Sequence, residues 1–88
     1  MKAYYNSSLE KLIISGINPE NINYPEIISA AKERGFEITE DIINWLVKAW
    51  RIDYKSNYHS NGVNFFAPCR CNDFSITIFR GDGHTYVA

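Results

Sequence analysis

The residues best suited to bind a metal are two cysteines and two histidines in the second half of the chain. Cys69 and Cys71 are two positions apart, so in an extended strand both side chains point to the same face. With His59 and His84 they supply four nitrogen and sulfur ligands, enough for a tetrahedral zinc site. The Cys-x-Cys spacing lacks the usual two-residue gap, however, and the histidines have no ligand spacing. We therefore expect two reduced thiols, with Cys69 towards the core, and neither a metal nor another cofactor.

The other polar motifs predict structure rather than catalysis. A thiol with two histidines is common in small domains, and the sequence contains no recognisable Ser, His and Asp arrangement. Gly81-Asp82-Gly83 offers a single carboxylate and precedes no helix, so it predicts a hairpin turn rather than a calcium or phosphate loop. Glu37, Glu40 and Asp41 are explained by the start of a helix. We predict that the protein is not an enzyme.

Large aromatic side chains are more numerous than one small core can face inward. Aromatic residues beside arginines are typical anchors of protein interfaces, because they bury large areas on binding. We therefore predict a protein-binding surface. Its candidate residues are Trp45, Arg51, Tyr54, Tyr58, Phe66, Arg70 and Phe79. In the alternative interpretation, the segment 54–60 covers Phe66 and Phe79, and they belong to the core.

Two consecutive helices can be predicted from local signals in the middle of the chain. Pro25 suits the first turn of a helix, and Gly35 followed by an apolar residue is typical of a helix end. Thr39 is a good N-cap for the next helix, and Ile38 and Ile43 have the spacing of a hydrophobic staple. The apolar stripe of this second helix contains Ile42, Ile43, Leu46, Ala49 and Trp50.

This helical corner resembles the Nif11 family of small bacterial domains. The resemblance covers about residues 9–46. The matching positions are Ile27, Ala31, Lys32, Glu33, Gly35, Phe36, Glu37, Thr39, Glu40 and Asp41. In that family such domains serve as leader regions that peptide-modifying enzymes and exporters recognise, or as small proteins without an assigned role. The resemblance thus implies a recognition module, although no Gly-Gly or Gly-Ala processing site follows the second helix.

The N-terminal part is predicted to add a third helix. Ser7 and Glu10 have the spacing of a capping box, and Leu9, Leu12 and Ile13 would share one helical face, so we expect a helix over residues 7–15. Residues 19–22 are expected to form a single further turn. Residues 1–52 would then be a three-helix unit.

The last third of the chain has the two-residue period of strands. Residues 53–62 form the expected linker, and strands are expected at 63–70, 74–80 and 84–87. Pro68 cannot donate to a sheet ladder, so the first strand should lie at an edge and the second in the middle. The face with Phe65, Phe74, Ile76 and Ile78 should cover the helices. The expected fold is α+β: one domain over 1–88, with a three-helix unit followed by a three-stranded antiparallel β-meander at 63–88.

Composition and charge exclude several classes of protein. With 45% hydrophobic and 15% aromatic residues the chain can build a core, and its net charge of -1 gives no field that attracts nucleic acid. No apolar run reaches the ~18 residues of a membrane span, and the N-terminus lacks the apolar region of a signal peptide. We therefore expect a cytoplasmic protein that binds neither membranes nor nucleic acid. Its partner would be another protein or a second copy of the chain.

The function predicted from the sequence is that of a non-enzymatic protein-binding domain, either a recognition module for a peptide-modifying enzyme or a self-standing adaptor. One alternative is an inhibitor of a host protein encoded by a phage or mobile element. A second alternative is a winged-helix-like DNA-binding regulator in which residues 41–50 form the recognition helix. That alternative is disfavoured because phosphates repel Glu40 and Asp41 at the start of this helix.

Overall fold

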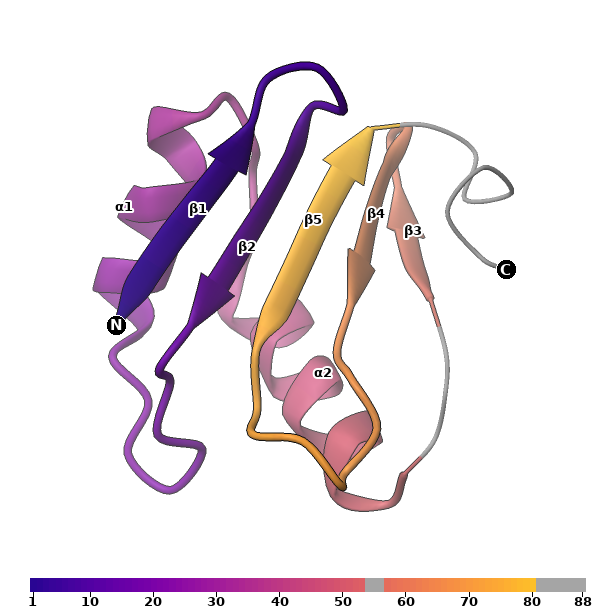
Figure 1. Cartoon of the computed structure of the whole chain (residues 1–88). Coiled ribbons are helices and arrows are strands. Elements are labelled where there is room, and N and C mark those ends of the chain that lie inside the picture. Colours follow the sequence, from indigo (N-terminus) through magenta and orange to yellow (C-terminus); the bar gives the residue numbers. More distant parts are fainter. Residues whose placement is uncertain (54–56, 81–88) are drawn as a thin grey trace.

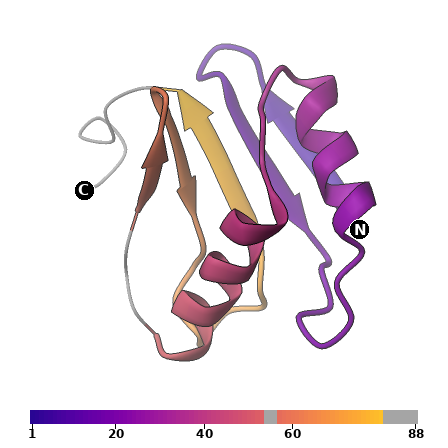
Figure 2. The same ribbon diagram turned by 180° about the vertical axis from the view of Figure 1, so that it is seen from behind.

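The fold is a five-stranded antiparallel sheet with two helices on one face. The computed structural model describes residues 1–53 and 57–80. The strand order is β1-β2-β5-β4-β3 (Figure 1). Seen from behind, α1 covers the side of the sheet with β1 and β2, and α2 covers the side with β5 and β4 (Figure 2). The elements are β1 (Lys2–Asn6), β2 (Lys11–Ser15), α1 (Tyr24–Glu33), α2 (Glu40–Arg51), β3 (Tyr58–Ser60), β4 (Val63–Phe66) and β5 (Ile76–Arg80).

The predicted three-helix unit is wrong, because the first fifteen residues form a β-hairpin. β1 pairs with β2 in an antiparallel register, and β2 pairs on its other side with β5. The turn is stabilised by the Asn6 side chain, whose Oδ1 accepts a hydrogen bond from the Leu9 N–H at 3.2 Å, and by Glu10 at a positive φ of 48°. Leu12 and Ile14 alternate into the core at 1% and 0% exposure. A four-residue turn explains the spacing of Ser7 and Glu10 as well as a helix start does.

The predicted helical corner is confirmed. Gly35 lies at a φ of 79°, and the Phe36 N–H donates to the Ala31 carbonyl at 3.0 Å, the long hydrogen bond of a Schellman ending. The Thr39 Oγ1 accepts a hydrogen bond from the Ile42 N–H at 3.2 Å, as expected of an N-cap. The first helix starts earlier than Pro25 suggested, because the Asn23 side chain caps it.

The strands differ from the expected three-stranded meander in number and position. β5 lies in the middle of the sheet, as predicted, but β4 lies between β5 and β3. The edge position inferred from Pro68 is therefore wrong, because β4 ends at Phe66 before the proline. Residues 58–60, expected in the linker, form β3 and pair with β4 across the Asn61–Gly62 turn. The strand expected at 84–87 lies outside the described residues.

The core lies between the sheet and the two helices. The predicted inward face of the sheet is confirmed, since Phe65, Phe74, Ile76 and Ile78 are all buried with Leu46 of α2. These residues join the helical side chains Ile27, Ala31, Ile42 and Ile43 in one cluster. Within residues 1–53 and 57–80 no third helix accompanies these two, so the arrangement needed for a winged helix is not found there. In the same part of the chain, neither helix has the length and apolarity to cross a membrane.

Candidate protein-binding site

The aromatic residues predicted from the sequence do not form one surface. Trp45 on α2 contacts Tyr58 on β3 edge to face, with ring centroids 5.3 Å apart, and Tyr58 contacts the buried Phe65 at 6.1 Å. Both Trp45 and Tyr58 are half-buried. This chain of rings fastens the short edge strand β3 to the core, so its main role is structural.

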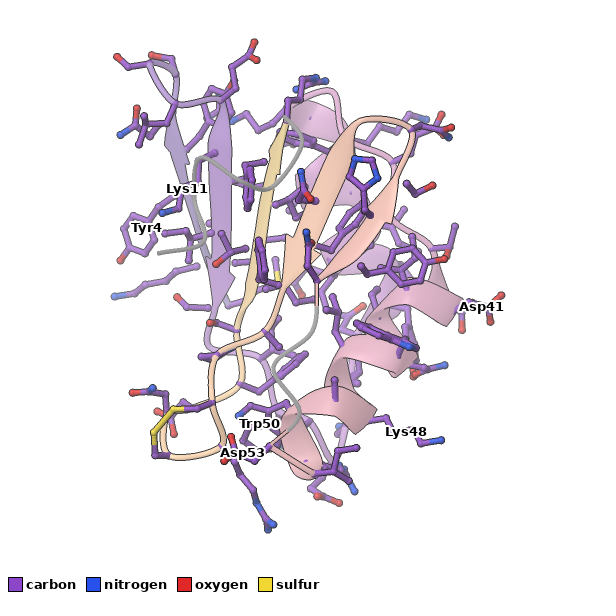
Figure 3. The ribbon with its side chains drawn as sticks, turned by 90° about the vertical axis from the view of Figure 1, so that its right-hand side faces the viewer. Tyr4, Lys11, Asp41, Lys48, Trp50 and Asp53 are labelled. Atoms are coloured by element: carbon purple, nitrogen blue, oxygen red, sulfur yellow. A yellow bond between two sulfur atoms is a disulfide. The ribbon has the colours of Figure 1, made fainter. Side chains whose placement is uncertain are left out.

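A second aromatic pair lies on the face of the sheet opposite to the helices. Because Ile78 points into the core, the next residue, Phe79, points to the opposite face, where it stacks on Phe66 with centroids 5.2 Å apart. Phe79 is only 1% exposed, so the prediction of an exposed anchor is wrong for this residue. Its cross-strand neighbour Asn64 is fully buried and accepts a hydrogen bond from the Asn57 side chain at 2.6 Å. Tyr4 and Lys11 also point away from the helices (Figure 3).

The two arginines of the predicted site do meet, at the C-terminal end of α2. The Arg51 guanidinium donates to the Glu20 carboxylate at 3.1 Å and to the Pro19 carbonyl at 3.2 Å. Arg70 donates through its side chain to the Arg51 carbonyl at 3.2 Å and through its backbone N–H to the Asp53 carboxylate at 3.1 Å. Two loops distant in sequence are therefore attached to one helix end. Tyr54, the remaining predicted residue, lies outside the described residues.

Beside these arginines the surface is hollowed into a groove of about 560 Å³. Its walls come from the end of β2, the following loop, the last turn of α2 and the segment before β5. The groove is lined by Ser15, Gly16, Ile17, Pro19, Trp50, Asp73, Phe74 and Ser75. We call this set the end groove.

Trp50 forms one wall of the end groove and is held from two sides. Its indole Nε1–H donates to the Asn72 carbonyl at 3.0 Å, and its ring meets Phe74 edge to face at 5.6 Å. Figure 3 shows Trp50 and Asp53 at the same lower end of the molecule, with the disulfide beside them and Asp41 far away along α2. Trp50 was expected in the core stripe of its helix. Its place in the last helical turn, where the stripe leaves the sheet, was the signal that could have identified it.

The end groove has an apolar floor and one charged group. Asp73 is the only charged side chain among the described residues that line it, and it is exposed. In residues 1–53 and 57–80 the one ion pair joins Arg51 to Glu20, so Asp73 is not neutralised by a cation of that part of the chain. The groove therefore offers apolar contact next to an available negative charge.

A second, smaller hollow of about 440 Å³ lies at the corner between the helices. Its lining includes Lys32 and Glu37, which carry opposite charges. The Arg80 guanidinium lies 4.4 Å from the Phe36 ring centroid and donates to the Gly35 carbonyl at 2.7 Å. The two opposite charges of the lining cancel, and the hydrogen bond of Arg80 to Gly35 attaches β5 to the corner.

The predicted state of the cysteines is wrong, because Cys69 and Cys71 are joined in a disulfide. The cysteines of a zinc site must be free thiolates, so this state of the protein does not offer those ligands. His59 lies on β3, opposite Asn64 of β4, and His84 lies outside the described residues. The part of the chain that the structure describes contains no cluster of three or more metal-binding side chains.

No known protein family, curated protein or solved structure matches this chain. The resemblance of the helical corner to Nif11 domains thus stays a prediction.

Proposed function

We propose that this protein is a small non-enzymatic protein-binding domain whose end groove receives a segment of a partner protein. The occupant is a segment that presents an apolar side chain next to a lysine or arginine. The apolar side chain lies against Ile17 and Trp50, and the cation lies at Asp73. The observation that carries the proposal is the combination of an apolar floor with one exposed, unneutralised carboxylate.

The dimensions of the end groove support a short segment as the occupant. Ligand-binding pockets have volumes of roughly 300–1,000 Å³, with mostly apolar walls and a few polar groups that fix orientation. The end groove, at about 560 Å³, lies inside this range. Tryptophan is also among the residue types enriched in the side chains that dominate binding energy at protein interfaces. The half-buried Trp50 can offer its remaining ring surface without a new rotamer, because Asn72 and Phe74 already hold it.

The attachment of the groove walls supports binding without a large rearrangement. Arg51 ties α2 to the loop at Pro19, and Arg70 ties α2 to the segment before β5. Walls fixed in this way lose less conformational freedom when a partner binds. The same groove serves the adaptor and the host-protein inhibitor predicted from the sequence, since these differ in the partner rather than in the surface.

Selection of peptides on the immobilised protein tests the proposal. A random peptide library should enrich sequences with an aliphatic or aromatic residue next to Lys or Arg. NMR shift changes on adding a selected peptide should centre on Ile17, Trp50 and Phe74. Shift changes confined to other surfaces, or selected peptides without basic residues, would overturn the proposal.

A matched pair of charge variants separates the role of Asp73 from that of net charge. The variant Asp73→Asn should weaken binding of the selected peptide by about 2- to 5-fold, the range for an exposed ion pair. Asp41→Asn makes the same change in net charge at the other end of α2 (Figure 3) and should leave the affinity unchanged. Equal losses in the two variants would show that Asp73 has no specific part in binding.

A further inference from the structure

The Cys69–Cys71 disulfide is not a stabilising staple of this fold. The two cysteines are two residues apart in sequence. A disulfide stabilises mainly by restricting the unfolded chain, and that restriction is weakest when the closed loop is this short. Arg70, Asn72 and Trp50 already attach the segment to α2 through hydrogen bonds. The disulfide therefore adds little to the attachment of this segment.

The disulfide is accessible to an attacking thiol. Cys69 and Cys71 lie in a bend that is closed by a hydrogen bond from the Asn72 N–H to the Cys69 carbonyl at 3.0 Å. Cys71 is exposed and Cys69 is half-buried. Figure 3 shows the disulfide projecting from the lower end of the molecule. Thiol–disulfide exchange requires a thiolate to reach one sulfur directly, and exposed disulfides are the ones that exchange.

The bend also contains a group that stabilises a departing thiolate. The Asn72 side-chain amide donates to the Cys69 sulfur at 3.3 Å and to the Cys71 sulfur at 3.6 Å. Hydrogen bonds to the sulfur favour the thiolate over the thiol, and a better-stabilised thiolate leaves faster. The closer approach of the amide to Cys69 makes that sulfur the better leaving group.

From these observations we infer that Cys69 and Cys71 form a reversible dithiol–disulfide couple that exchanges electrons with low-molecular-weight thiols of the glutathione class. An external thiolate attacks the exposed Cys71 sulfur, the S–S bond breaks, and its electron pair leaves on Cys69. A second external thiolate then attacks the sulfur of the first, which releases Cys71 and forms the external disulfide. Two external thiols are oxidised, the protein disulfide is reduced by two electrons, and the two protons end on the cysteines.

The redox state of the two cysteines should change the environment of the Trp50 indole. The Asn72 carbonyl that accepts the indole N–H belongs to the residue whose side chain contacts both sulfurs. Opening of the disulfide removes the covalent restraint on this bend, so the hydrogen bond to Trp50 changes. This inference does not depend on peptide binding in the end groove, because it concerns only the two cysteines and the bend that holds them.

A redox titration of the full chain tests the inference. Protein is equilibrated in buffers with different ratios of reduced to oxidised glutathione, quenched in acid and alkylated. Mass spectrometry then counts the alkylated thiols. The chain has two cysteines, so we expect a reversible change from no free thiol to two. The Trp50 indole N–H signal should shift with the same midpoint, while that of Trp45 serves as the internal reference. A disulfide that persists in excess reduced glutathione, or that never forms in excess oxidised glutathione, would overturn the inference.

Two further experiments test the direction of attack. Wild-type protein that is partly reduced with glutathione and quenched in acid should carry the trapped mixed disulfide on Cys71, which peptide mapping by mass spectrometry locates. Asn72→Ala removes the side-chain amide and keeps the backbone carbonyl that Trp50 contacts, and it should slow reduction by roughly 3- to 10-fold. A mixed disulfide trapped on Cys69 would contradict attack at Cys71, and an unchanged rate for Asn72→Ala would contradict the role of the amide.

Discussion

The two ends of α2 are held in different ways. At the N-terminal end the Thr39 hydroxyl accepts the N–H of Ile42, three residues away, and Glu40 and Asp41 complement the helix dipole. At the C-terminal end the side-chain hydrogen bonds are long-range: Arg51 donates to residues 19 and 20, Trp50 donates to the Asn72 carbonyl, and Arg70 donates to the Arg51 carbonyl. One end is thus specified by its own neighbours, and the other by loops brought to it by the sheet.

This difference explains where the candidate sites lie. At the N-terminal end the Thr39 cap uses only neighbouring residues, so no loop from elsewhere in the chain has to pack against it. At the opposite end, loops from both halves of the protein converge on the last helical turn and enclose the end groove. The same loops place the disulfide beside Trp50. Binding and redox chemistry are therefore proposed at the end whose geometry depends on distant residues.

The largest expected effect comes from the middle of α2, which both ends share. Leu46 is fully buried, so Leu46→Ala should lower the free energy of unfolding by about 2–5 kcal/mol through lost burial and a cavity. Urea unfolding, monitored by circular dichroism, measures this change in the free energy of unfolding. The exposed Lys48 is the control, because Lys48→Ala should change the stability by less than about 0.5 kcal/mol. A loss below about 1 kcal/mol for Leu46→Ala would show that the ends do not share one core.

Removal of the cap should destabilise the N-terminal end alone. Thr39→Ala leaves the Ile42 N–H without the hydroxyl acceptor and should cost about 1 kcal/mol. Thr39→Ser keeps the hydroxyl and should retain most of the stability. Hydrogen exchange of the first-turn amides should increase in the alanine variant while residues 50–53 stay protected. Equal destabilisation by alanine and serine would rule out the hydroxyl as the cause.

Loss of the indole hydrogen bond should loosen the C-terminal end. Trp50→Phe keeps an aromatic ring against Phe74 but removes the N–H that donates to Asn72, at an expected cost of about 0.5–1.5 kcal/mol. Hydrogen exchange should rise in residues 69–75 and not in the first turn of α2. Trp45→Phe, the same change beside Tyr58, is the control for ring size. Faster exchange in the first turn of α2 in Trp50→Phe would show that the two ends of α2 are not stabilised independently.

The smallest effect is expected for the surface ion pair of Arg51 and Glu20. Their side chains are 46% and 78% exposed, so the coupling energy should be at most about 1 kcal/mol. A double-mutant cycle of Arg51→Gln and Glu20→Gln measures it by urea unfolding. The coupling should disappear in about 1 M NaCl, where exposed charges are screened. A coupling that survives in this salt would mean that the pair is effectively buried.

Structure was predictable from the sequence where the atoms that decide it lie within a few residues of each other. Gly35 and Thr39 act on amides at most four residues away, so their roles as helix end and cap were readable. The helix predicted for residues 7–15 was wrong, because the spacing of Ser7 and Glu10 fits either a helix start or a turn. Pairing of β2 with β5, more than sixty residues later in the chain, decided between them.

The candidate site was predictable only in part. Arg51 and Arg70 were identified by residue type, and the structure brings them together. Trp50 and Asp73 were missed, since a groove depends on which loops meet. Only Trp50 had a local signal, its place in the last turn of the helix, and Asp73 had none. Phe79 was misassigned because alternation in a strand shows which side chains share a face and not which face is covered.

The sequence by itself determined the helical corner from Asn23 to Arg51 and the face of β5 that packs on it, because caps, glycine endings and strand alternation act over short distances. The tertiary structure alone decided the N-terminal hairpin, the order of the five strands and the end groove. These features depend on contacts between segments far apart in the chain. Such contacts become favourable only when the whole core is buried at once.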